Sequence, residues 1–122
     1  MTAPDAARIA IVDDDPAVRE SLRFLLEVAG FSVDAFASAA EFSARRARSN
    51  PCGLILDHHM PIVTGLELVA QLRAAGDALP VLLITGSPSA AIIARAASLH
   101  VKVLEKPPAE QDLLAFAHSI AG

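Results

Sequence analysis

The chain has few of the residues that mark several large classes of protein. Its 122 residues include one cysteine, no tryptophan and no tyrosine. The single cysteine, Cys52, excludes an internal disulfide and is typical of a protein kept in a reducing compartment. No uninterrupted apolar run reaches the roughly 18 residues that a membrane-spanning helix needs. The start of the sequence also lacks the charged and then apolar layout of a signal peptide, so we expect a cytoplasmic location and no membrane partner.

Positive charge is also scarce. Lysine and arginine number 10 against 14 acidic residues, which gives a formal net charge of −4. The basic cluster of Arg45, Arg46 and Arg48 falls at the predicted C-terminal end of a helix, where cations interact favourably with the helix dipole. We therefore expect a solvated helix end there, and no direct binding of nucleic acid. The length fits one domain that spans residues 1–122.

Strand-like and helix-like segments alternate five times along the chain. The predicted strands are the apolar runs at 9–12, 31–36, 53–56, 80–85 and 101–104, and the predicted helices cover 16–29, 38–47, 64–76, 87–98 and 108–121. Asp15 and Thr64 are expected to cap two of the helices, and Ser87 with Pro88 to begin the fourth. Strict alternation predicts a doubly wound parallel α/β sheet with helices on both faces, in the flavodoxin-like order 2-1-3-4-5.

Aspartates follow two of the predicted strands. Asp13 and Asp14 come after the first strand, and Asp57 comes after the third. In a sheet of this order, ligands bind beyond the carboxyl ends of the strands, where the first and third strands lie side by side. Carboxylates crowded together repel one another unless a cation sits among them, and Mg²⁺ or the ammonium of Lys106 suits that place. Asp15 is better explained as a helix cap than as a ligand.

The same edge carries the groups that phosphoryl transfer needs. Asp57 can act as a carboxylate nucleophile that forms an aspartyl-phosphate. Mg²⁺ held by Asp14 and Asp57, with Asp13 contributing through water, would neutralise the phosphate oxygens. Thr85 and Lys106, at the ends of the fourth and fifth strands, offer a hydroxyl and a positive charge for the remaining oxygens.

Four fragments, in order and in register, resemble the receiver domain of two-component response regulators. They are residues 11–15, residues 56–61 with Gly65, residues 84–86 and residues 105–107. Residues 15–22 look most like receivers attached to helix-turn-helix transcription factors of the nitrogen-fixation and nitrate-response type. The resemblance covers almost the whole chain and implies a phosphorelay switch rather than an enzyme.

The resemblance also implies the role of each residue in the site. Asp57 would accept a phosphoryl group from a sensor histidine kinase or a phosphotransfer protein, and Thr85 and Lys106 would sense it. The Mg²⁺ ligands would be Asp13, Asp14, Asp57 and the backbone carbonyl of His59. A cis Lys106-Pro107 bond is implied as well. The expected partners are an output domain or protein that regulates transcription, and a second copy of the chain after phosphorylation.

Three departures from the resembled family fall on the face that normally transmits the signal. Val103 stands where an aromatic residue is usual, Ser98-Leu99-His100 replaces Ala-Gly-Ala, and the loop at residues 86–89 is slightly short. A module that binds partners without phosphorylation therefore stays open as an alternative. His58 and His59 are expected to diverge rather than to chelate a metal jointly, with His59 beside the site, where it would tune hydrolysis of the acyl phosphate.

A phosphohydrolase is the second alternative. In that reading Asp13 attacks the phosphate and Asp15 is the acid. Ala17 stands where such enzymes have threonine or valine, and the length leaves no room for a cap module. A receiver would instead be phosphorylated once, on Asp57.

Overall fold

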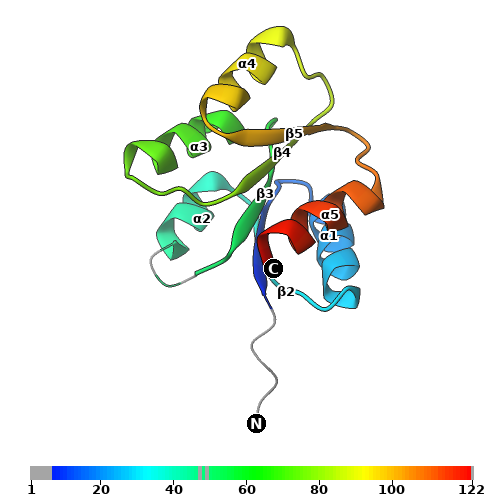
Figure 1. Cartoon of the computed structure of the whole chain (residues 1–122). Helices are drawn as coiled ribbons and strands as arrows, with labels where there is room; N and C mark the ends of the chain where they lie inside the picture. The colour runs from blue at the N-terminus through cyan, green and yellow to red at the C-terminus, as the bar shows by residue number, and fades with distance from the viewer. Residues whose placement is uncertain (1–6, 47, 49, 122) are drawn as a thin grey trace.

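The chain forms a five-stranded parallel sheet covered by helices on both faces (Figure 1). The computed structural model describes residues 7–46, 48 and 50–121. The strands run in the order β2-β1-β3-β4-β5, as the alternation of segments predicts. The elements in chain order are β1 (Arg8–Val12), α1 (Pro16–Val28), β2 (Ser32–Phe36), α2 (Ala39–Arg45), β3 (Gly53–Asp57), α3 (Gly65–Ala74), β4 (Val81–Thr85), α4 (Ala90–Ser98), β5 (Val101–Glu105) and α5 (Glu110–Ala121).

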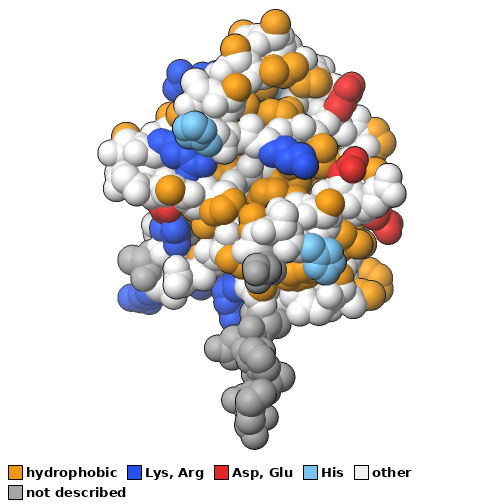
Figure 2. Space-filling view, viewed as in Figure 1, with side chains coloured by type: hydrophobic (Ala, Val, Ile, Leu, Met, Phe, Trp, Pro, Cys, Tyr) orange, Lys and Arg blue, Asp and Glu red, His pale blue; other side chains and the backbone are white. Residues whose placement is uncertain are grey.

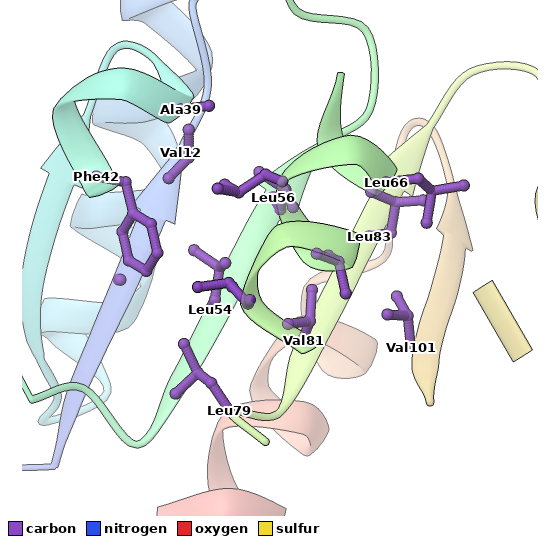
Figure 3. Close-up of a cluster of buried hydrophobic side chains, with 14 of the residues drawn as sticks. Val12, Ala39, Phe42, Leu54, Leu56, Leu66, Leu79, Val81, Leu83 and Val101 are labelled. Carbon is purple, nitrogen blue, oxygen red and sulfur yellow. The ribbon is translucent and has the colours of Figure 1, made fainter. Parts of the chain in front are cut away.

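Two hydrophobic layers hold the helices against the sheet. Every residue of β3 and β4 is buried, as expected for inner strands of a parallel sheet covered on both faces. On one face, Phe42 of α2 and Leu66 of α3 pack over the sheet (Figure 3). On the other face, Leu26 of α1 and Phe116 of α5 do the same. This packing fixes the strand ends that carry the functional residues.

The helix starts follow local capping rules. The side chain of Asp15 accepts a hydrogen bond from the backbone nitrogen of Ala17 at 2.9 Å, with Pro16 at the first helical position, as predicted. Thr64 and Glu67 form the predicted capping box at α3. Gly30 follows α1 with a φ of +99°, a conformation that glycine adopts without steric cost. Within the described residues, no helix is long and apolar enough to cross a membrane.

The predicted starts of the last two helices were wrong by two residues. Helix α4 begins at Ala90, and Ser89 rather than Ser87 caps it, accepting from the nitrogen of Ile92 at 3.2 Å. Ser87 lies before the helix, where its backbone nitrogen donates to Thr85 Oγ1 at 3.3 Å. Helix α5 begins at Glu110 instead of residue 108. The predicted end of the second helix at Ala47 lies outside the described residues.

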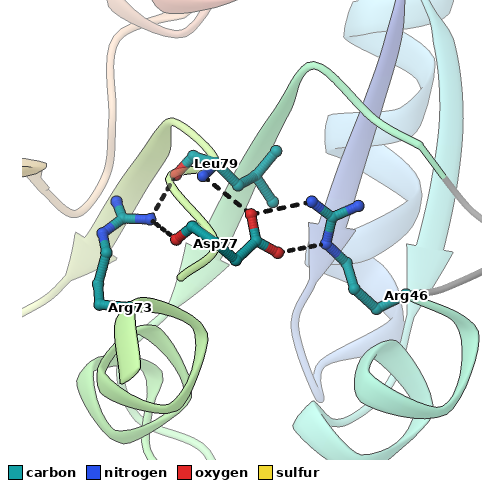
Figure 4. Close-up of polar contacts among 4 residues, drawn as sticks. All are labelled: Arg46, Arg73, Asp77 and Leu79. Carbon is teal, nitrogen blue, oxygen red and sulfur yellow. Dashed lines mark hydrogen bonds and ion pairs between the residues drawn. The ribbon is translucent and has the colours of Figure 1, made fainter. Parts of the chain in front are cut away.

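The expectation of a fully solvated cluster at the end of α2 was wrong for Arg46. Its guanidinium binds both carboxylate oxygens of Asp77, at 2.8 and 3.0 Å, across to the loop between α3 and β4 (Figure 4). This contact holds the pKa of Asp77 below its ordinary value. Arg73 donates to the carbonyls of Asp77 and Leu79, both at 2.9 Å, so the loop is anchored from both sides.

Candidate functional site

The predicted site residues meet at one edge of the sheet. Asp57 and Thr85 are the last residues of β3 and β4, while Asp13 and Lys106 directly follow β1 and β5. The strands are parallel and in register, so their carboxyl ends open on the same side. The topology therefore brings together four residues that span 94 positions of sequence, from 13 to 106.

Three carboxylates form an acidic cluster. Asp13, Asp14 and Asp57 each offer an oxygen, and these oxygens lie within 4.8 Å of one another. Asp13 and Asp57 are 4% exposed, whereas Asp14 is open to solvent. Burial raises the pKa of Asp13, and the charges of Asp57 and Asp14 act in the same direction, against the bond that Asp13 accepts from the nitrogen of Asp15. Like charges are held close at this site, which favours a bound cation.

Lys106 is the resident cation of the site. Its Nζ forms an ion pair with Asp57 Oδ1 at 2.8 Å. Burial by itself would lower the pKa of Lys106, but the contact with Asp57 and the charges of Asp13 and Asp14 outweigh it and raise the pKa. The ammonium therefore stays charged beside Asp57. The Lys106-Pro107 bond is cis, as the resemblance implies.

The donor set suits a hard divalent cation. Mg²⁺ takes oxygen ligands, usually one or two carboxylates together with water and phosphate oxygens. Here two buried carboxylates and one exposed carboxylate converge, and the single charge of Lys106 leaves the cluster net negative. Asp13, Asp14 and Asp57 thus fit Mg²⁺ by chemistry and by spacing.

The side chains of Thr85 and His59 form a hydrogen bond at the carboxyl edge of the sheet. Thr85 is fully buried, and its Oγ1 lies 3.0 Å from His59 Nε2 and 3.3 Å from the backbone nitrogen of Ser87. His58 faces elsewhere, since its Nδ1 accepts from the nitrogen of Leu66 at 3.4 Å. Burial, reinforced by the neighbouring His59, lowers the pKa of His58. The expectation that the two side chains diverge was wrong, because their rings pack edge-to-face with centroids 5.2 Å apart, although their nitrogens bind separate partners.

Gly65 brings α3 close to the site. A Cβ at this position would lie 2.8 Å from the carbonyl oxygen of Asp57 and 2.9 Å from the Cα of His58. Both atoms belong to the backbone and cannot move aside cheaply, so only glycine permits this approach. The close approach lets the nitrogen of Gly65 donate to the carbonyl of His58 at 3.1 Å, which closes the turn after β3.

Sequence reasoning missed Arg19. From α1, its guanidinium donates to the backbone carbonyl of Asp13 at 2.8 Å and so fixes the turn that carries Asp13 and Asp14. Arg19 is four residues after the cap Asp15, which places both on one helix face. That spacing is a weak signal, because exposed arginines at helix starts are common. The contact depends on how the loop between β1 and α1 folds back toward the helix, which the sequence does not indicate.

Val103 borders an open hollow between α4 and β5. The space-filling view shows hydrophobic side chains at the surface beside these two elements (Figure 2). The hollow measures about 390 Å³. Val103 is half-buried, and its short side chain leaves this space next to the core. The lining residues are Pro88, Ile93, Ala97, Val101, Val103 and Glu105.

Comparison with known proteins shows one family. A sequence model described as the response regulator receiver domain matches residues 9–118. Response regulator MprA of Mycobacterium leprae (strain TN) is 44% identical over 111 residues, covering 88% of this chain and 48% of MprA. This chain therefore spans about half the length of the curated relatives that it matches.

Solved structures give the same result. Full-length FixJ from B. japonicum superposes with a TM-score of 0.86 at 32% identity, covering 96% of this chain and 58% of FixJ. Response regulator StyR superposes with a TM-score of 0.85 at 38% identity, covering 95% of this chain and 59% of StyR. In both comparisons, part of the larger protein lies beyond the matched region.

Proposed function

The chain belongs to the response regulator receiver domain family, and from this premise we propose that Asp57 is its phosphoacceptor. The observation that carries the proposal is the convergence of Asp13, Asp14 and Lys106 on Asp57 at the end of β3. As a receiver domain, the chain is not a catalytic enzyme. One of its own side chains becomes phosphorylated.

The proposed reaction is in-line transfer of a phosphoryl group to Asp57. A carboxylate oxygen of Asp57 attacks the phosphorus of a phosphohistidine, forming a P–O bond. The P–N bond breaks, and its electron pair leaves with the imidazole of the donor. Lys106 is placed to stabilise the added negative charge, and Asp13 and Asp14 are placed to hold Mg²⁺. Asp57 and the carbonyl of His59 would complete the ligand set, and the bound Mg²⁺ would supply positive charge to the phosphate oxygens.

The geometry favours this reaction over a phosphohydrolase that uses Asp13 and Asp15. A hydrolase would need Asp15 as a free acid facing the site. Asp15 instead uses its carboxylate to accept from the nitrogen of Ala17 at the start of α1.

The finer identity of the protein is also part of the proposal. The family implies a histidine kinase as the phosphate donor. We propose an output domain or protein that regulates transcription, because MprA, FixJ and StyR extend well beyond the matched region. The nitrogen-fixation and nitrate-response subtype rests on the resemblance of residues 15–22. We also propose one receiver domain over residues 1–122, a cytoplasmic location and a homodimer after phosphorylation.

Phosphorylation is tested directly by intact mass. The protein is incubated with acetyl phosphate and Mg²⁺, and its mass is measured alongside Asp57→Asn. We expect one phosphoryl adduct on the wild type, none on Asp57→Asn, and little adduct in chelator. Asp15→Asn is the matched control and should still be phosphorylated, because Asp15 serves the helix start. An adduct that persists on Asp57→Asn would place the acceptor elsewhere, and no adduct on any variant would favour a module that works without phosphate.

A further inference from the structure

The Thr85 hydroxyl has two hydrogen-bonding partners in the described part of the chain. Its Oγ1 lies 3.3 Å from the backbone nitrogen of Ser87 and 3.0 Å from His59 Nε2. The amide of Ser87 can only donate, so Oγ1 is the acceptor in that bond. The bond with His59 is the one that can engage the hydroxyl proton.

The single proton of this hydroxyl needs an acceptor. Thr85 is 0% exposed, so solvent does not reach it, and a buried hydroxyl proton without a partner is costly. Of the two described partners, only the histidine nitrogen can accept a hydrogen bond. Thr85 is therefore assigned as the donor to His59 Nε2, an arrangement that requires the ring proton of His59 to sit on Nδ1.

We propose that His59 is a positioning residue that holds the Thr85 hydroxyl in the resting state, and that phosphorylation transfers this hydrogen bond from His59 to a phosphoryl oxygen. The proposal rests on the proposed role of Asp57 and deepens it. Thr85 ends the strand next to β3, and its backbone carbonyl accepts from the nitrogen of Lys106 at 2.9 Å. A movement of the Thr85 side chain toward Asp57 thus begins at a residue that is also tied to Lys106.

One proton cannot serve both acceptors fully. The bond to His59 stabilises the resting arrangement and must be given up before Thr85 can bind a phosphoryl oxygen. A ligand shifts an equilibrium only by its differential contacts with the two states. The strength of the bond to His59 therefore contributes directly to the free-energy difference between the resting and switched states. Removing the acceptor leaves the hydroxyl proton unsatisfied in the resting state alone, and should favour the switched state.

The test is the affinity for beryllofluoride, a phosphoryl mimic, in the presence of Mg²⁺. His59→Leu removes the acceptor, and we expect its Kd to fall about three- to tenfold relative to the wild type, the worth of one hydrogen bond. His59→Gln keeps an acceptor oxygen at similar reach and should restore a Kd near that of the wild type. His58→Leu is the matched control: it removes the adjacent imidazole, which packs against the His59 ring and accepts from the nitrogen of Leu66 rather than from Thr85, so the Kd should change far less than in His59→Leu.

A double variant isolates the contact. In a Thr85→Val background, which has no hydroxyl, His59→Leu should no longer change the Kd. An equal change in both backgrounds would mean that His59 acts without Thr85, and would overturn the proposal. An unchanged or weakened affinity in His59→Leu, with the wild type binding normally, would overturn it as well.

The resting contact is also observable without metal or mimic. The ¹⁵N NMR spectrum of the His59 ring at pH 8 should show an unprotonated Nε2 and a protonated Nδ1, and Nε2 should lose its hydrogen bond when beryllofluoride and Mg²⁺ are added. The opposite ring tautomer would overturn the assignment of the proton. If the wild type binds no beryllofluoride, the proposed function of Asp57 fails, while the tautomer still decides the resting contact separately.

Discussion

At the scale of single residues, Ile62 is the least expected feature of the site loop. It is 99% exposed and has a φ of +71°, a conformation that branched side chains rarely adopt. Such a residue costs of order 1–3 kcal/mol in backbone strain and gains nothing from burial. It lies five positions after Asp57, so the strain is located in the loop between β3 and α3.

We expect Ile62→Asn to raise the free energy of unfolding by about 1 kcal/mol, because asparagine tolerates a left-handed backbone and no packing is lost. Chemical denaturation of the two proteins measures the difference. Ile62→Val is the control, since it keeps the branched Cβ and should leave stability nearly unchanged. A fall in stability for Ile62→Asn would show that the isoleucine side chain contributes more than its exposure indicates.

At the scale of elements, the contact between Arg46 and Asp77 joins α2 to the loop that leads into β4. The two side chains are 24% and 22% exposed and bind in a bidentate arrangement. We expect Arg46→Ala to lower the free energy of unfolding by about 1–2 kcal/mol at neutral pH. Arg46→Lys should recover only part of this loss, because an ammonium cannot bind both oxygens in the same plane.

The same contact predicts a pH dependence. The pKa of Asp77 is lowered in the folded protein, chiefly by its bond to Arg46, from an ordinary value of 3.8. The stability it contributes is fully present above that value and is lost as the pH falls through the lowered folded pKa. The difference between wild type and Arg46→Ala should therefore be constant near neutrality and shrink below pH 3.8. Arg45→Ala serves as the control at the same helix end, and an equal loss in both variants would contradict a specific pair.

The hollow beside Val103 bears on how the signal leaves the site. Valine has one short, stiff rotor, so it has few alternative contacts to make when Thr85 moves. We expect the signal to pass mainly through the loop from Gly86 to Ser89. Chemical-shift changes on adding beryllofluoride and Mg²⁺ should therefore concentrate at residues 57–64 and 85–90.

An added aromatic ring provides the comparison. Val103→Phe would supply a side chain large enough to enter the hollow of about 390 Å³, and shift changes should then extend into β5 and α4. If the largest changes beyond the site in the wild type already fall on residues 101–104 and on the facing side of α5, the valine does not block that route.

Sequence predicted the fold and the clustering of the site well, because both follow from local signals. Apolar runs set the strands, and parallel strands must deliver Asp13, Asp57 and Lys106 to one edge. The failures involve partners far apart in sequence. Arg46 and Asp77 are 31 residues apart, and His59 and Thr85 are 26 residues apart. The start of α4 was misplaced because Ser87 and Ser89 are both able to cap, and the sequence pattern does not distinguish them; the structure has Ser89 as the cap.

At the scale of the whole molecule, the acidic cluster couples metal binding to stability. Mg²⁺ that binds the folded chain alone should raise the melting temperature, and the rise should grow with the logarithm of the Mg²⁺ concentration once that exceeds the Kd. We expect Asp14→Ala to lose most of this shift, whereas Glu110→Ala, an exposed carboxylate on α5, should keep it. Equal Mg²⁺ shifts in wild type and Asp14→Ala would place the ion elsewhere.

In chelator, Asp13→Asn should be more stable than the wild type, because burial and neighbouring charges disfavour the ionised Asp13.

Locating the phosphoryl group tests most directly whether Asp57 is the side chain that accepts it. After treatment with acetyl phosphate and Mg²⁺, borohydride reduces an aspartyl-phosphate to homoserine, which marks the acceptor in a peptide map. We predict homoserine at residue 57 and unchanged aspartate at residues 13, 14 and 15. Homoserine at any of those three positions, with residue 57 unmodified, would contradict the account.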